Sequence, residues 1–269
     1  MSHKTFKEIS NFISEFSVSS FNKEDMVIKY LKYFSIEELC FKLSEDNKDY
    51  SFSKLDRTVS EKETKPYEPE YNDLCRLHYL ILKRKTLTVL EFGSGFSTSV
   101  IAHALSILKE YFNEWAIKNT RIDEPFCVHS LEPNKNYIEI TRSRLSSNCL
   151  ENSKIYHCPV KLSLHDNRLV TFYDNFPNVS ADLIYIDGPS LFDTKENING
   201  LALNYKFRMP MAADLLRFEF LLEPGTLVIV DGRTLNSRFL KSYLKREWKY
   251  YHDKDGDVSY FELIEEPLG

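Results

Sequence analysis

Residues 91–98 combine a carboxylate, two glycines and three hydroxyls within eight positions. Gly93 and Gly95 let the backbone turn sharply and approach a ligand closely, because no Cβ stands in the way. Ser97 or Thr98 can cap the helix that we expect to follow, by accepting from its first N–H groups. The candidate ligand-binding residues of this stretch are Glu91, Gly93, Ser94, Gly95, Ser97 and Thr98.

The charge of Glu91 narrows the chemistry of the ligand. A carboxylate at this point would repel a pyrophosphate and attract a cationic amino-acid group. In addition, position 98 is Thr, where the dinucleotide-binding pattern GxGxxG has its third glycine. The stretch therefore favours a ligand with a positive charge, while a nicotinamide-dependent oxidoreductase stays open as an alternative.

A second acidic residue, Glu132, follows the apolar stretch 126–131. A carboxylate at the end of the second strand of a nucleotide-binding α/β fold can accept hydrogen bonds from both hydroxyls of a ribose. Taken alone, Glu132 could equally be a solvated strand end. Together with the glycine turn at 93–95, it predicts a ribose contact.

Two aspartates end later apolar stretches, Asp187 after 181–186 and Asp231 after 226–230. A carboxylate at such a position can orient a nucleophile, take its proton or bind a metal ion. Arg233 offers two parallel N–H donors to a carboxylate or phosphate, although it could instead pair with either aspartate. The candidate catalytic residues are Asp187, Asp231 and Arg233.

Alternating strands and helices must position these residues. The apolar patterns predict strands at 86–92, 126–131, 154–160, 181–186, 226–230, 248–252 and 258–264. Helical patterns separate most of them, including stretches at 135–146 and 211–222, which predicts a parallel sheet covered on both faces. Ligands of such folds bind beyond the carboxyl ends of the strands, where every candidate above falls.

Two further segments flank this pattern. Residues 1–70 read as an N-terminal helical extension followed by a polar linker, and residues 71–269 as the main domain. The long connection 188–210 is a candidate lid over a substrate, with Asn199, Tyr205 and Arg208 as contacts. The N-terminal helices either cover the crevice expected at the carboxyl ends of the strands or form a homodimer contact.

Residues 86–264 resemble the class I S-adenosylmethionine-dependent methyltransferases. The resemblance is carried by LEFGSGFST, SLEPN, ADLIYIDGP and EPGTLVIVDGR, in this order. It implies a Rossmann-like, seven-stranded, mostly parallel sheet with an antiparallel last strand, and S-adenosylmethionine as cofactor. It further implies that Gly93 and Gly95 lie against the methionine and ribose portions, and that Glu91 helps to hold the amino group. Glu132 would take the ribose hydroxyls, and the adenine contact would come just after the third strand.

The resemblance also implies an activity. Asp187 sits where the family places residues that face the transferred methyl group. In the metal-dependent O-methyltransferases, an Asp at each of positions 187 and 231 binds a divalent ion and an Asn follows the second, whereas Gly232 and Arg233 follow here. We therefore expect methyl transfer to an oxygen or nitrogen of a small molecule, with a metal ion not favoured. A non-catalytic module that binds the cofactor or another nucleotide is the alternative.

Composition excludes other classes of partner. The formal net charge is −5 and the basic residues are spread out, so no nucleic-acid partner is expected. No run of eighteen apolar residues and no signal-peptide pattern occurs, so we expect no membrane partner. Five cysteines without a CxxC pair indicate a reducing compartment, hence the cytoplasm. His78, His103 and His157 lack metal-ligand spacing and are expected in the core or on the surface.

Overall fold

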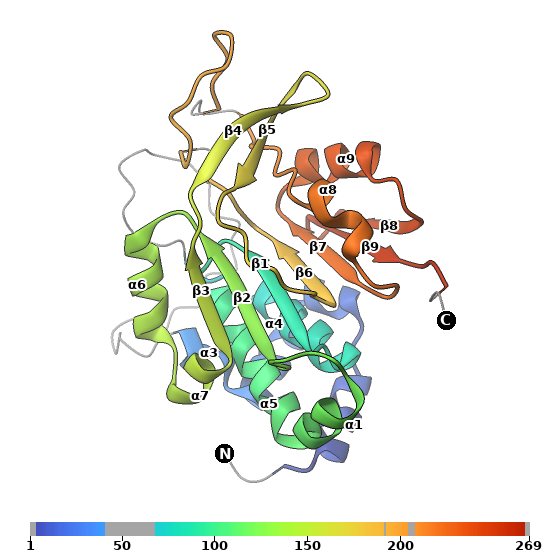
Figure 1. Cartoon of the computed structure of the whole chain (residues 1–269). Coiled ribbons are helices and arrows are strands. Elements are labelled where there is room, and N and C mark those ends of the chain that lie inside the picture. The colour runs from blue at the N-terminus through green and yellow to red at the C-terminus, as the bar shows by residue number, and fades with distance from the viewer. Residues whose placement is uncertain (1–3, 41–67, 191, 204–207, 267–269) are drawn as a thin grey trace.

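A seven-stranded sheet forms the centre of the protein (Figure 1). The computed structural model describes residues 4–40, 68–190, 192–203 and 208–266. The strand order is β3–β2–β1–β6–β7–β9–β8. The strands are β1 (Thr88–Phe92), β2 (Cys127–Glu132), β3 (Ser153–His157), β6 (Leu183–Ile186), β7 (Leu227–Asp231), β8 (Trp248–Asp253) and β9 (Val258–Leu263).

The strand directions confirm the predicted fold class. Strands β1, β2, β3, β6 and β7 are parallel, and β9 lies antiparallel to both β7 and β8. The fold is therefore Rossmann-like, with an antiparallel last strand and additional helices at the N-terminus. Because β1 pairs with both β2 and β6, the strand order reverses at β1, and open α/β sheets bind ligands at such a point.

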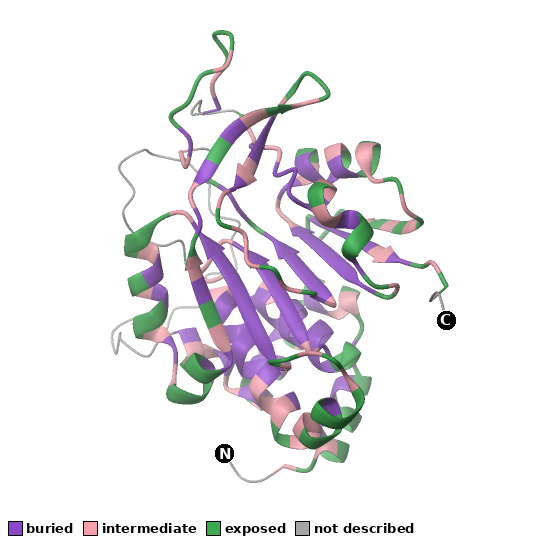
Figure 2. Cartoon of the chain, viewed as in Figure 1, coloured by how far each residue is buried: buried purple, intermediate pink, exposed green. Residues whose placement is uncertain are grey.

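Helices cover both faces of this sheet, and its strands β1, β2 and β6 are entirely buried (Figure 2). Side chains of one strand alternate between two hydrophobic clusters: Val89 packs into the first and Leu90 into the second. The helices of the first face are α4 (Tyr71–Arg84), α5 (Phe96–Asn119), α6 (Lys135–Arg144) and α7 (Ser147–Glu151). The second face carries α8 (Leu215–Phe218), η2 (Glu219–Leu221) and α9 (Thr234–Tyr243).

The N-terminal helices share the core of the first face. They are α1 (Phe6–Ser14), η1 (Val18–Asn22), α2 (Glu24–Phe34) and α3 (Ile36–Cys40). Tyr30 of α2 is fully buried and lies within hydrogen-bond distance of His78 Nδ1 of α4, at 3.0 Å. Tyr79 Oη donates to the carbonyl oxygen of Phe16 over 2.9 Å. Most of the expected linker falls outside the described residues.

The segment after β3 differs from the prediction. The expected strand 154–160 ends at His157, because Pro159 has no N–H with which to continue the ladder. Strands β4 (Val160–His165) and β5 (Arg168–Tyr173) instead form a separate antiparallel hairpin, which projects from the main sheet (Figure 1). Its turn residues, Asp166 and Asn167, have φ values of 49° and 58°.

Two predicted helices are shorter than expected. The predicted helix 135–146 ends at Arg144, and the short helix α7 follows. Within the predicted helix 211–222, the start is extended, since Thr171 N donates to Met211 O and Ala213 N donates to Thr171 O. Only α8 and η2 remain helical there.

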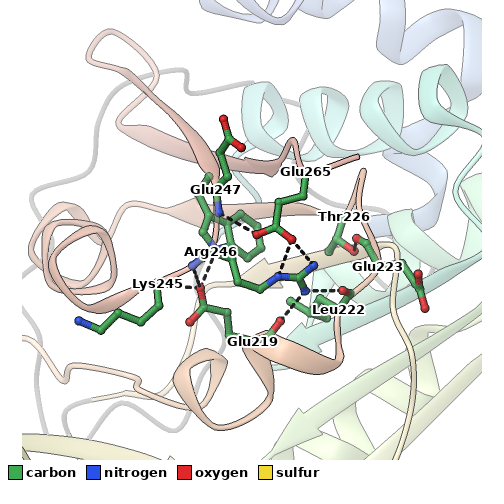
Figure 3. Close-up of polar contacts among 9 residues, drawn as sticks. Glu219, Leu222, Glu223, Thr226, Lys245, Arg246, Glu247 and Glu265 are labelled. Atoms are coloured by element: carbon green, nitrogen blue, oxygen red, sulfur yellow. Dashed lines mark hydrogen bonds and ion pairs between the residues drawn. The ribbon is translucent and has the colours of Figure 1, made fainter. Parts of the chain in front are cut away.

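A polar cluster fastens the C-terminal hairpin β8–β9 beside η2 (Figure 3). The carboxylate of Glu219 is 2% exposed, and its Oε1 accepts from Lys245 N, Arg246 N and Trp248 Nε1 over 2.8, 2.8 and 2.9 Å. Arg246 donates to Glu265 Oε2 and to the carbonyl oxygens of Glu219 and Leu222.

None of the described helices combines the length and the apolar character that a membrane crossing requires.

Candidate functional site

The carboxyl ends of β1, β2 and β6 meet at two glycine turns. Gly93 has a φ of +108°, a conformation that favours glycine. A Cβ on Gly188 would lie 2.5 Å from Tyr173 Oη and 2.9 Å from Phe92 O, so only glycine fits there. A Cβ on Gly93 would lie 3.8 Å from Gly188 N, so the two turns lie side by side.

Glu91 is fully buried beneath this turn, and protein hydroxyls surround its carboxylate. Oε1 accepts from Ser97 Oγ over 2.5 Å, and Oε2 accepts from Thr98 Oγ1 over 2.7 Å and from Ser130 Oγ over 2.5 Å. Burial raises the pKa of Glu91, and the three hydroxyls oppose that rise. The carboxylate thus holds β1, β2 and α5 together, and its contact with a ligand amino group stays a prediction.

The start of α5 differs from the expectation, because Gly95 occupies the N-cap position and Ser97 and Thr98 lie inside the first turn. The helix begins at Phe96, and Thr98 Oγ1 accepts from Gly95 N over 3.0 Å. Thr98 therefore links the glycine turn to Glu91, while Ser97 contacts the carboxylate alone. Neither hydroxyl has been placed against a ligand.

Glu132 has a different environment. Its side chain is 5% exposed, Oε2 accepts from Ser94 Oγ over 2.9 Å, and Oε1 accepts from Asn134 N over 2.9 Å. Burial raises the pKa of Glu132 to about 7, and the charges of Asp193 and Glu91 contribute to the rise. Each oxygen carries one protein donor, so each retains a position that can accept from a further hydroxyl.

Asp187 is exposed at the end of β6, and its backbone N–H donates to Phe92 O over 3.2 Å. Its charge acts on two neighbours, since it raises the pKa of Tyr185 and opposes the lowering of the pKa of Arg233 by burial. Asp187 therefore lies at the adjoining carboxyl ends of the paired strands β1 and β6, open to solvent. Its role in catalysis stays a prediction.

Arg233 does not present a free bidentate fork. Its side chain is 8% exposed, Nη1 donates to Pro189 O and Nη2 donates to Pro210 O, both over 3.0 Å. The guanidinium therefore holds both ends of the connection 188–210 to the end of β7. Its Nε has no hydrogen-bond partner among the described residues.

Asp231 faces the α4 side of the sheet. It accepts a hydrogen bond from Tyr185 Oη and lines a cavity of about 10 Å³, together with Asp73 and Arg76 of α4. The charges of Asp187 and Asp231 both raise the pKa of Tyr185, after the larger effect of its burial, so this residue lies near both. Within the described ranges, no three His, Cys, Asp or Glu side chains gather in a way that could hold a metal ion.

The connection after β6 contributes residues that the sequence does not single out. Asp193 Oδ2 accepts from Ser190 N over 2.6 Å, and burial raises the pKa of this carboxyl to about 6. Of the predicted lid contacts, Asn199 and Arg208 are exposed, and Arg208 donates to Ala202 O. Tyr205 lies outside the described residues.

No family model and no curated protein matches this chain. Solved structures with a similar course of the chain include the O-methyltransferase TomG from Streptomyces achromogenes in complex with S-adenosylmethionine, at 14% identity, a TM-score of 0.41 and coverage of 74% of this chain and 82% of that one. The S-adenosylhomocysteine-bound methyltransferase PaMTH1 from Podospora anserina is 11% identical, with a TM-score of 0.43 and coverage of 98% and 97%. An O-methyltransferase from Bacillus cereus is 12% identical, with a TM-score of 0.37 and coverage of 97% and 100%. All three TM-scores lie below 0.5.

Proposed function

We propose that this protein is an S-adenosylmethionine-dependent methyltransferase that acts on an oxygen or nitrogen nucleophile of a small molecule. The observation that carries the proposal is Glu132, a buried carboxylate with one open acceptor position on each oxygen, beside the glycine turn at the point where the strand order reverses. Two ribose hydroxyls would fill both positions.

The remaining residues of the crevice fit the same cofactor. The turn at Gly93 leaves room for a ligand against its backbone, because no Cβ projects there. Asp187 and Asp193 supply negative charge near the place where a sulfonium and an ammonium group would lie. The sequence resemblance assigns the methionine and ribose portions to Gly93 and Gly95, which agrees with this distribution of charge.

S-adenosylmethionine, when bound, supplies a methyl group that its sulfonium has already activated. The protein then has to align the acceptor with that methyl group and to remove one proton. Asp187 is suited to both tasks, since it is exposed at the end of β6 beside the crevice. Arg233 contributes by fixing the connection 188–210, and Asp231 by shaping the side that faces Tyr185.

Calorimetric titration with S-adenosylhomocysteine tests the cofactor assignment. We expect micromolar binding to the wild-type protein and a loss of at least tenfold in Glu132→Gln, because the amide can accept fewer hydrogen bonds than the carboxylate. Glu139→Gln changes an exposed carboxylate of the nearby helix α6 and serves as the matched control. If the wild-type protein shows no binding at millimolar ligand, the cofactor assignment is wrong.

Turnover separates an enzyme from a module that only binds. A mixture of phenols, carboxylic acids and amines is offered with S-adenosylmethionine, and release of S-adenosylhomocysteine is measured. We expect release by the wild-type protein and a fall of about 100-fold in Asp187→Asn with cofactor binding retained. Wild-type turnover in Asp187→Asn would remove this residue from the mechanism.

A further inference from the structure

Buried polar atoms without a partner gather around the end of β5. Eleven buried side-chain nitrogen or oxygen atoms of the described residues have no hydrogen-bond partner. Four of these atoms belong to one region, on Thr171 and Tyr173 of β5, on Asp214, whose carboxylate accepts from Tyr173 N, and on Arg233. Native proteins keep few such atoms, and each of them calls for an explanation, a ligand being one.

Tyr173 is the most strongly fixed of these residues. It ends β5, it is 1% exposed, and its backbone N–H donates to Asp214 Oδ1 over 2.9 Å. Its ring packs edge-on against Phe92 at a centroid distance of 5.4 Å. Packing on this scale leaves the ring little freedom, so the hydroxyl is held beside Gly188 at the end of β6.

The guanidinium of Arg233 reaches the same turn. Its Nη1 donates to Pro189 O, the residue after Gly188, while Nε remains without a partner. The charge of Arg233 lowers the pKa of Tyr173 against the larger effect of burial, so the two side chains lie within electrostatic reach. Two buried donors, one of them on a cation, thus flank the turn at Gly188–Pro189.

The charges nearby select the group that could accept from these donors. Glu132 and Asp193 both act on Tyr173, and Asp187 and Asp193 both act on Arg233. Two carboxylates beside one guanidinium disfavour a phosphate, which carries up to two negative charges. A carboxylate that belongs to a zwitterion fits better, because its ammonium group gains from the surrounding aspartates.

We propose that Tyr173 Oη and Arg233 Nε bind the carboxylate of the amino-acid moiety of the cofactor. The inference rests on the proposed function, since S-adenosylmethionine carries such a zwitterion at the end that lies beside Gly93. Tyr173 is then a binding residue that gains its hydrogen-bond partner only from the ligand.

The test compares two ligands in Tyr173→Phe. S-adenosylhomocysteine carries the amino-acid moiety, and 5′-methylthioadenosine has the same nucleoside without it. We expect calorimetry to show a loss of about tenfold or more for S-adenosylhomocysteine, the usual effect of losing a hydrogen bond to a charged group, and an unchanged affinity for 5′-methylthioadenosine. Tyr260→Phe is the matched control, because it also removes a buried hydroxyl without a partner.

Thermal unfolding of the ligand-free proteins checks the fold of the variant. Since the hydroxyl of Tyr173 has no partner, Tyr173→Phe is expected to unfold at or above the wild-type temperature. Equal losses for both ligands, or no loss for either, would overturn the carboxylate assignment. Absence of S-adenosylhomocysteine binding in the wild-type protein would instead overturn the proposed function.

Discussion

Two buried carboxylates of this site differ in how many donors surround them. Three hydroxyls of the protein donate to Glu91, whereas Glu132 receives one donor on each oxygen. A saturated carboxylate fixes the local structure, and one with open positions is available to a ligand. Sequence spacing alone treats the two glutamates alike, and only their environments distinguish them.

The raised pKa of Glu132 predicts how ligand binding depends on pH. Burial raises this pKa to about 7, and hydrogen bonds from two ribose hydroxyls would favour the charged form. Binding therefore requires loss of a proton below pH 7. We expect the affinity for S-adenosylhomocysteine to fall about tenfold from pH 8 to pH 6 in calorimetric titrations.

Variants identify the carboxyl group responsible. Glu132→Gln is expected to bind weakly with little change between pH 8 and pH 6. The charge of Asp193 acts on Glu132, and the pKa of Asp193 is raised to about 6, so Asp193→Asn is the matched control and should keep most of the pH dependence. An unchanged slope in Glu132→Gln would show that another group titrates.

At the scale of elements, the sequence predicts the strand ends well. The runs that end at Phe92, Ile186 and Val230 are mostly apolar and have a glycine within the next two residues, so their ends could be read directly. Parallel strands then bring Glu91, Glu132 and Asp187 to one edge of the sheet. Their place at this edge could be predicted because the carboxyl ends of parallel strands lie at the same edge of a sheet, whereas their contact with a ligand stays a prediction.

The hairpin β4–β5 was missed, and Tyr173 with it. Alternation at Val160, Leu162 and Leu164 was present, but its turn is Asp166-Asn167 where Asn-Gly or Asp-Gly would be the stronger signal. Asp193 was missed for another reason. It lies in an irregular connection, where no periodicity indicates which side chains turn inward.

Arg233 is predicted to control the connection 188–210, since it binds Pro189 O and Pro210 O at once. Arg233→Lys keeps the charge but cannot reach both carbonyl oxygens in the same geometry. We expect faster hydrogen exchange at Ala213, whose N–H bonds to Thr171 O, and a loss of about 1–3 kcal/mol in urea unfolding. Exchange at wild-type rates would show that the two hydrogen bonds of Arg233 do not stabilise this connection.

Glu219 fixes the C-terminal hairpin β8–β9 in the way that Arg233 fixes the connection 188–210 (Figure 3). Glu219→Ala leaves three N–H donors without their acceptor, so we expect the free energy of unfolding to fall by about 2–4 kcal/mol. Glu223→Ala removes an exposed carboxylate nearby and is expected to have an effect within about 0.5 kcal/mol. Similar losses in the two variants, measured by urea unfolding, would contradict this reading.

At the scale of the whole molecule, a buried polar chain joins the N-terminal helices to the sheet-bearing part. Tyr30 Oη lies 3.0 Å from His78 Nδ1, and His78 Nε2 lies 3.0 Å from His103 Nδ1 of α5. Burial lowers the pKa of His103 to about 4 and that of His78 well below its usual value. Both histidines are therefore neutral in the folded protein at pH 7, as core residues.

The two buried histidines predict that the protein loses stability at acidic pH. When a histidine is neutral in the folded protein but binds a proton in the unfolded protein, the folded state loses stability as the pH falls from about 6.5 towards 4. Removing one such group in His103→Gln should make the loss between pH 6 and pH 5 smaller by about 1.4 kcal/mol per pH unit. Urea unfolding measures it, with His157→Gln at an exposed position as control. Parallel pH profiles for wild type and His103→Gln would refute the assignment.

The connection that follows β6 contacts both strands of the hairpin β4–β5. Thr171 of β5 bonds to Met211 and Ala213, and Leu162 N of β4 donates to Glu196 Oε2 over 2.5 Å. An uncovered two-stranded ribbon invites a strand from another molecule. One proteolytic cut in residues 195–203 would release this cover, and strand exchange between copies, followed by aggregation, would then be the expected fate of the cleaved protein.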